Sequence, residues 1–127
     1  DTSDYLGEMR QALLLQRVRY GSGGLNADEV LKMATDNGAQ VLGFSQVGRV
    51  EPGYAADLAI FDMDKLEYSG SRSDPFASLI FCGFNHASDY TICNGRIVVD
   101  QGKLTGIDEE KLKADANRIA AGLIDHA

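Results

Sequence analysis

Residues 90–99, YTICNGRIVV, carry the strongest local structural signal in the chain. The dipeptide Asn94-Gly95 separates two runs of residues that favour extended structure. A type I′ turn needs positive φ at both central residues, and Asn followed by Gly adopts these angles readily. The sequence therefore predicts a β-hairpin at this point.

Segments on both sides of the hairpin extend the predicted sheet. Gln101-Gly102-Lys103 is a second turn signal, after which Leu104 can continue as a short strand. Earlier in the chain, Leu58 to Phe61 is a continuous apolar run between two aspartates, which is typical of a short buried strand. Residues 63–75 are polar and irregular, and the pattern leaves residues 76–81 open between helix and strand.

Helical periodicity dominates the start of the chain. Apolar residues recur at steps of three and four from Tyr5 to Tyr20, with Thr2 or Ser3 as the expected N-cap and Gly21, Gly23 and Gly24 as the expected stop. The apolar run at residues 12–15 widens the apolar face of this helix. We therefore expect the helix to pack against more than one neighbour.

Two more helices follow from cap signals. Asn26 and Glu29 form a capping-box pattern, and Asn37-Gly38 predicts the end of that helix, with a short further turn at residues 39–42. Asp108 is the expected cap of a last helix. The apolar residues on one face of that helix are Leu112, Ala116, Ile119, Ala120, Leu123 and Ile124.

The composition is that of one ordinary globular domain of 127 residues, 44% of them hydrophobic. The formal net charge is −7, which disfavours nucleic acid and anionic membrane surfaces as partners. The longest apolar runs are far shorter than the ~20 residues of a membrane helix.

Cys82 and Cys93 each lie in an apolar run, so we expect buried free thiols and a reducing, cytoplasmic compartment. The opening residues lack an initiator Met, as in a fragment or processed product.

A search for catalytic patterns finds no complete active site. His86 and His126 are forty residues apart, and His86 with the two cysteines has no zinc-ligand spacing, so we expect His86 to cap or hydrogen-bond near a strand start. The glycine-rich residues 21–24 follow a helix rather than a strand, unlike a phosphate-binding loop. The chain on its own is therefore expected to bind no catalytic metal and to catalyse no reaction.

Residues 48–61, GRVEPGYAADLAIF, resemble a segment of the metal-dependent amidohydrolases. In that family the segment leads from the (β/α)8 barrel into a small β-sandwich. Three pairs precede it in family order, Ala34-Thr35, Gly38-Ala39 and Leu42-Gly43, and the hairpin follows it. The resemblance spans nearly the whole chain.

The opening residues 1–16, DTSDYLGEMRQALLLQ, narrow this resemblance to the branch of hydroxyatrazine hydrolase, 8-oxoguanine deaminase and chlorohydrolase-like enzymes. In that branch a divalent metal, zinc or iron, activates the water that replaces the amine of an N-heterocycle. The resemblance implies that the metal ligands lie upstream of this chain. It also places Asp1, Thr2 and Ser3 at the rim of the substrate pocket.

The resulting expectation is an α+β fragment of a hydrolytic deaminase. Residues 1–45 would supply the last helices of the (β/α)8 (TIM) barrel, 46–106 part of the β-sandwich, and 107–127 a C-terminal helix that packs on the barrel. The expected partners are the N-terminal barrel portion of the same enzyme and a small heterocyclic substrate of 8-oxoguanine, guanine or hydroxytriazine type. The sequence leaves open whether the longer enzyme forms a homodimer. The alternative is a free-standing, non-enzymatic binding or interaction module.

Overall fold

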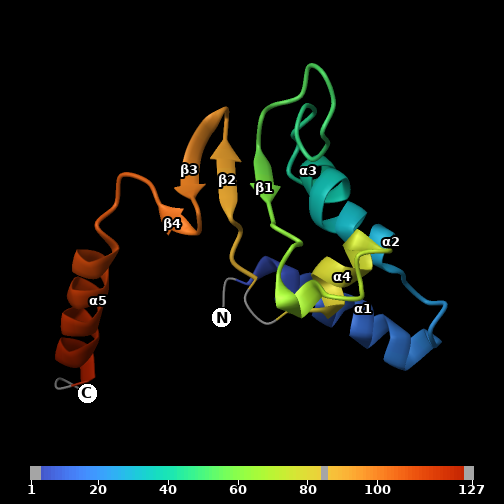
Figure 1. Cartoon of the computed structure of the whole chain (residues 1–127), viewed down its shortest axis with the longest axis horizontal. Helices are drawn as coiled ribbons and strands as arrows, with labels where there is room; N and C mark the ends of the chain where they lie inside the picture. The colour runs from blue at the N-terminus through green and yellow to red at the C-terminus, as the bar shows by residue number, and fades with distance from the viewer. Residues whose placement is uncertain (1–3, 84–85, 125–127) are drawn as a thin grey trace.

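The computed structural model describes residues 4–83 and 86–124 of the chain, and it combines a helical half with a four-stranded sheet. In Figure 1 the helices α1 (Tyr5–Tyr20), α2 (Ala27–Lys32) and α4 (Pro75–Phe81) lie together on one side of the sheet. The last helix, α5 (Glu109–Ile124), stands at the other end of the molecule. None of the helices in the described ranges is long and apolar enough to cross a membrane.

Helix α1 begins and ends where local chemistry favours it. The bounds Tyr5–Tyr20 confirm the predicted helix, and Gly21 ends it with a φ of 77°. The predicted cap is wrong, because the side chain of Asp4 accepts the hydrogen bond from the N–H of Gly7. An aspartate directly before the first helical residue can accept from the free amides of the first turn, as it does here.

Helix α2 runs on without the predicted stop. The capping box of Asn26 and Glu29 is present as expected, with both hydrogen bonds 2.9 Å long. The helix then widens into a π-helical turn, Met33–Asn37, and continues as α3, Gly38–Val41. The prediction of a stop at Asn37-Gly38 was wrong because Gly38 keeps right-handed helical angles, with φ −60°. The chain leaves the helix only at Gly43, where φ is 79°.

Residues 76–81, for which the sequence left helix and strand open, belong to helix α4. Asp74 caps it by accepting from the N–H of Ala77, and Pro75 occupies the first turn, where its missing N–H is not needed. A turn of 3₁₀ helix, Leu66–Tyr68, interrupts the otherwise irregular loop before it. The apolar run therefore becomes a short helix that packs on α1 and α2.

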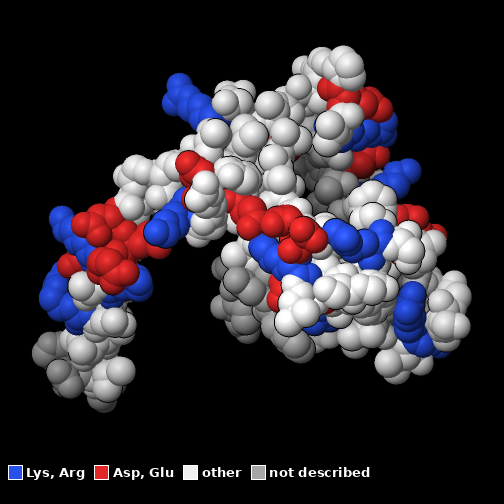
Figure 2. Space-filling model, viewed as in Figure 1, with Lys and Arg blue, Asp and Glu red and all other residues white. Residues whose placement is uncertain are grey.

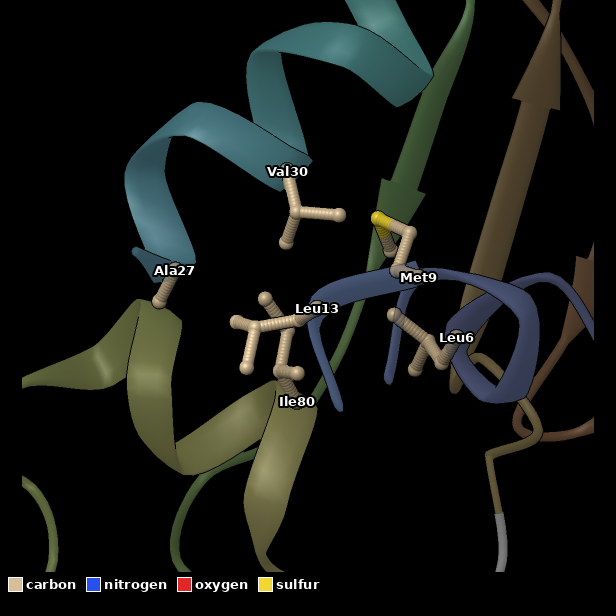
Figure 3. Packing of buried hydrophobic residues seen from close by; sticks show 6 residues of the cluster. All are labelled: Leu6, Met9, Leu13, Ala27, Val30 and Ile80. Carbon is tan, nitrogen blue, oxygen red and sulfur yellow. The ribbon is translucent and has the colours of Figure 1, made fainter. Parts of the chain in front are cut away.

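The core lies between these three helices. Figure 3 shows the buried side chains of α1, α2 and α4 directed toward one another. They are Leu6, Met9, Leu13, Ala27, Val30 and Ile80. Leu13 has no exposed surface, whereas 41% of Leu14 and 67% of Leu15 are exposed. The widened apolar face of α1 is thus covered along one stripe and uncovered along the rest.

The sheet is antiparallel, with the strand order β1-β2-β3-β4. Strands β1 (Leu58–Ile60), β2 (Tyr90–Cys93), β3 (Arg96–Asp100) and β4 (Lys103–Leu104) occupy the predicted extended segments. The prediction that the first of them is buried was wrong, because β1 is an edge strand and its Ala59 and Ile60 are exposed. Asn94 and Gly95 have φ of 47° and 76°, as a type I′ turn requires. Thr91 faces Val99 and Ile92 faces Ile97, so Val98 is the extra residue of a β-bulge.

Helix α5 buries no side chain among the described residues. Its predicted cap is confirmed, since Asp108 accepts from the N–H of Lys111. Figure 2 shows acidic and basic side chains interleaved along this helix. Two ion pairs lie on it, Lys113–Glu110 and Arg118–Asp115. Leu112 and Ile119 on the predicted apolar face are more than half exposed.

The two cysteines are free thiols. Cys82 is partly buried where α4 ends. The prediction that Cys93 is buried was wrong, because this residue ends β2 beside the hairpin turn and is exposed.

Candidate functional site

A cleft of about 880 Å³ lies between the helical half and strand β1. Most of its lining is apolar and comes from α1, α2, α4 and the residues around β1. The apolar side chains are Leu6, Met9, Leu31, Ala34, Val50, Leu58, Ala59, Phe61, Phe76, Leu79 and Ala87. The polar side chains are Asp4, Tyr5, Thr35, Arg49, Asp57, His86 and Ser88. An apolar cleft with a few polar groups is typical of a binding site, either for a small molecule or for another part of a protein.

An Asp–His pair forms one part of the cleft wall. Nδ1 of His86 lies 2.6 Å from Oδ2 of Asp4, although the two residues are 82 positions apart. The pKa of the Asp4 carboxyl is lowered, first by the hydrogen bond from the N–H of Gly7 and then by the bond to His86. His86 thus hydrogen-bonds just before a strand start, as predicted, and its partner is a helix cap that the prediction did not name.

Arg10 of α1 hydrogen-bonds to the end of α4, which precedes His86 in the sequence. Its Nε donates to the carbonyl of Ile80 over 2.6 Å, and its Nη2 donates to the carbonyl of Gly83 over 3.4 Å. Both carbonyls lie at or after the end of α4, where helix carbonyls lack partners of their own. One side chain of α1 therefore holds the end of α4.

An ion pair between Arg49 and Asp36 anchors the loop that enters β1. Arg49 donates to both carboxylate oxygens of Asp36, over 2.9 and 2.8 Å. This bond is the main reason that the pKa of Asp36 is lowered and the pKa of Arg49 is raised. Gly48 lies so close to the π-helical turn that a Cβ there would come within 2.9 Å of the carbonyl oxygen of Thr35. The close approach and the bidentate pair together fix this loop on the helices.

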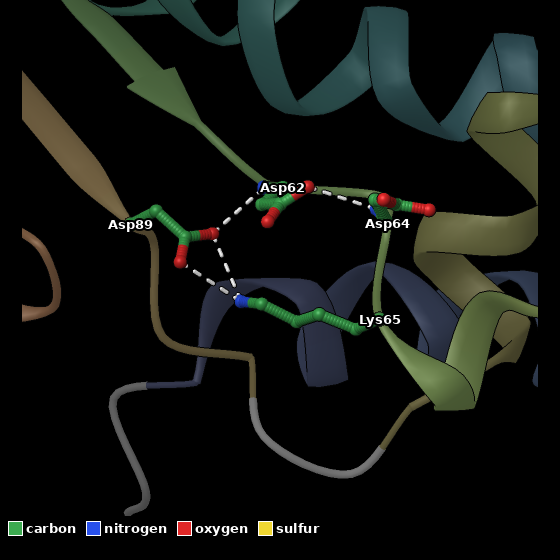
Figure 4. Close-up of polar contacts among 4 residues, drawn as sticks. All are labelled: Asp62, Asp64, Lys65 and Asp89. Atoms are coloured by element: carbon green, nitrogen blue, oxygen red, sulfur yellow. Dashed lines mark hydrogen bonds and ion pairs between the residues drawn. The ribbon is translucent and has the colours of Figure 1, made fainter.

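A third polar cluster joins the end of β1 to the start of β2 (Figure 4). Lys65 lies 2.9 and 3.0 Å from the two carboxylate oxygens of Asp89, and the N–H of Asp62 donates to the same carboxylate over 2.7 Å. The N–H of Asp62 and the Lys65 ammonium both lower the pKa of Asp89, and the hydrogen bond to Asp89 raises the pKa of Lys65. Both carboxylate oxygens of Asp89 accept a hydrogen bond from within the chain, so we interpret this cluster as structural.

The sequence-predicted site residues are only partly placed. Asp1, Thr2 and Ser3, predicted for the pocket rim, lie outside the described residues, as does His126. In the described ranges, no three His, Cys, Asp or Glu side chains lie close enough together to hold a metal ion. No step through a metal is therefore derived from these residues.

Four residues of the cleft region were missed by reasoning from the sequence: Asp4, Arg10, Asp36 and Arg49. Asp4 had a detectable signal, since an aspartate directly before a periodic apolar segment is a preferred helix cap. The other three act on partners 13 or more residues away. Local periodicity carries no information about such pairings.

The chain belongs to the amidohydrolase family. The model described as "Amidohydrolase family" matches residues 1–98. The chain is 40% identical to the 8-oxoguanine deaminase of Pseudomonas aeruginosa over 124 residues, which cover 98% of this chain and 27% of that enzyme. It is 36% identical to the 5-methylthioadenosine/S-adenosylhomocysteine deaminase of Pelotomaculum thermopropionicum over 123 residues, covering 96% and 28% of the two chains.

Solved structures agree with this family assignment. Atrazine chlorohydrolase from Arthrobacter aurescens TC1, complexed with zinc, matches with a TM-score of 0.83 and 31% identity over 89% of this chain and 25% of that one. An adenosine deaminase from Xanthomonas campestris with bound zinc matches with a TM-score of 0.84 and 30% identity, covering 91% and 26%. The chain thus spans about a quarter of the length of the relatives that it matches.

Proposed function

We propose that this chain is the C-terminal part of a longer amidohydrolase that hydrolytically deaminates an N-heterocycle. The observation that carries the proposal is the 40% identity to an 8-oxoguanine deaminase along almost the whole chain. In the proposed reaction water adds to the ring carbon that bears the amine, ammonia leaves, and a carbonyl remains. Purine-type and triazine-type rings both stay in the substrate class, because the relatives include deaminases of purine compounds and a triazine hydrolase.

The proposal divides the chain into three structural roles. Residues 1–45 would close the barrel, 46–106 would form part of a β-sandwich that upstream strands complete, and 107–127 would pack on the barrel. Support comes from the apolar surface that this chain leaves uncovered. Leu15 and Val18 on α1 and Ile119 on α5 are all more than half exposed. Burying such side chains against an upstream barrel would stabilise the longer protein by about 25 cal/mol per Å² of apolar area.

The metal ligands of the proposed enzyme lie upstream of this chain. Two of the similar solved structures carry zinc, and zinc or iron is the metal that we propose for the longer protein. Among the residues described here, no group of three His, Cys, Asp or Glu side chains could hold it alone. Their proposed contribution is the end of the barrel wall and its connection to the sheet, with Asp1, Thr2 and Ser3 at the rim of the substrate pocket.

Ammonia release tests the proposal. The assay compares this chain with the natural full-length polypeptide, using 8-oxoguanine, guanine, 5-methylthioadenosine and a hydroxytriazine as substrates. We expect turnover of at least one of them by the full-length polypeptide and none by this chain, with stoichiometric zinc or iron only in the former. Turnover and bound metal in this chain alone would contradict the proposal. A gene that encodes only these residues would favour the alternative, a binding module that uses the 880 Å³ cleft.

A further inference from the structure

His86 holds a buried nitrogen atom that lacks a hydrogen bond. Only 9% of its side chain is exposed, and Nε2 has no hydrogen-bond partner among the described residues. The large majority of buried side-chain polar atoms in native proteins have such a partner, and leaving one without costs free energy. The atom therefore calls for a specific partner.

For a neutral imidazole, the pairing with Asp4 determines which kind of partner Nε2 requires. In a neutral imidazole one ring nitrogen carries the proton and the other accepts. A carboxylate 2.6 Å from Nδ1 favours the tautomer in which Nδ1–H donates to Oδ2 of Asp4. Nε2 is then an oriented acceptor, and it requires an N–H or O–H donor.

The polar side chains around the cleft are already engaged elsewhere. Tyr5 donates to the carbonyl of Ala34, and Thr35 donates to the carbonyl of Leu31. Ser88 shares a hydrogen bond with Thr91. Arg49 is held by Asp36, and the carboxylate of Asp57 accepts from the N–H of Asn94. Each of these polar groups thus has a partner of its own, and none of them donates to Nε2 of His86 in the described part of the cleft wall.

We propose that Nε2 of His86 accepts a hydrogen bond from a donor in the upstream portion of the same polypeptide, which enters the cleft. This inference rests on the proposed function only in requiring that the upstream portion exists. Asp4 belongs to the start of α1 and His86 to the segment before β2, so the added bond ties the upstream portion to the helical half and the sheet at one point. His86 is then a positioning residue between the three parts of the enzyme.

Two substitutions of His86 test the roles of its two ring nitrogen atoms separately. His86→Asn keeps an N–H near the position of Nδ1, which can still donate to Asp4, and deletes the acceptor at Nε2. His86→Gln carries its amide to the position of Nε2 and loses the bond to Asp4. The matched control is Lys65→Met, which breaks the ion pair to Asp89 between β1 and β2 and does not touch the cleft. Thermal melting and ammonia release are measured on the natural full-length polypeptide.

We expect His86→Asn to lower the melting temperature by about 2–4 °C more than Lys65→Met does, and His86→Gln to recover part of the loss. We also expect KM to stay unchanged in His86→Asn. A tenfold rise in KM with an unchanged melting temperature would overturn the inference, because the donor would then be the substrate. Melting temperatures of both His86 variants equal to the wild type would overturn it as well. The melting arm does not depend on turnover, so a full-length polypeptide without deaminase activity would refute the proposed function and leave this test intact.

Discussion

The helical half and helix α5 differ in what their apolar residues contact. Leu13 of α1 is completely covered by α2 and α4, whereas Leu123 of α5 is 70% exposed. Both helices have 16 residues, and both carry apolar side chains at helical spacing. The helical half therefore contains its own core, whereas the apolar face of α5 is left uncovered by the described residues.

The largest effect is expected in the core of the helical half. Leu13→Ala should lower the free energy of unfolding by about 2–5 kcal/mol, because it removes buried methyl groups and leaves a cavity. Leu15→Ala in the same helix is the matched control and should change it by less than about 0.5 kcal/mol in this chain. Urea unfolding measures both. Equal losses would show that the two faces of α1 are not distinguished by burial.

A glycine pair tests how the loop before β1 is fixed on the helices. Gly48 and Gly53 both have positive φ, 90° and 92°, but only at Gly48 would a Cβ meet neighbouring backbone. Gly53→Ala should cost about 1 kcal/mol for its conformation alone, and Gly48→Ala should cost more because the π-helical turn must also shift. Urea unfolding of the two variants gives the difference. A smaller loss for Gly48→Ala than for Gly53→Ala would contradict the close packing.

In the sheet the expected effect is smaller. Gly95→Val places a β-branched side chain at a φ of 76° in the hairpin turn, at a cost of about 1 kcal/mol or more. Gly95→Asn is the control, because Asn tolerates this conformation. Thermal melting compares the two variants. An unchanged melting temperature for Gly95→Val would contradict the turn assignment.

Acid should weaken the Asp4–His86 hydrogen bond, the Asp36–Arg49 ion pair and the cluster beside β1. The pKa values of Asp4, Asp36 and Asp89 are lowered in the folded chain. Their stabilising contribution is therefore complete above the unfolded pKa of about 3.9 and is lost as the pH falls through the lower folded values. Unfolding measured between pH 6 and pH 2 should show this loss, reduced in Asp36→Asn. A loss of the same size in Asp36→Asn would remove the Asp36–Arg49 pair from the explanation.

Local chemistry in the sequence accounts for most elements of the fold. Asn26 with Glu29 and Asn94 with Gly95 each determine a cap or a turn within four residues, and the structure has both. The predicted helix stop at Asn37-Gly38 was wrong because a glycine also fits a right-handed helix, and the widening into a π-turn depends on surrounding contacts. The Asp4–His86 pair joins residues 82 positions apart, so only the folded chain brings it together. The rim residues 1–3 stay a prediction.

The central claim is that the helical half packs its own core, whereas α5 requires the upstream portion to become packed. Amide hydrogen exchange tests this claim most directly. It compares this chain with the natural full-length polypeptide. We predict that amides of α1 beside Leu13 and Leu6 exchange slowly in both, and that amides of α5 exchange rapidly in this chain and at least a hundredfold more slowly in the full-length polypeptide. Rapid exchange of α5 in both would contradict the account.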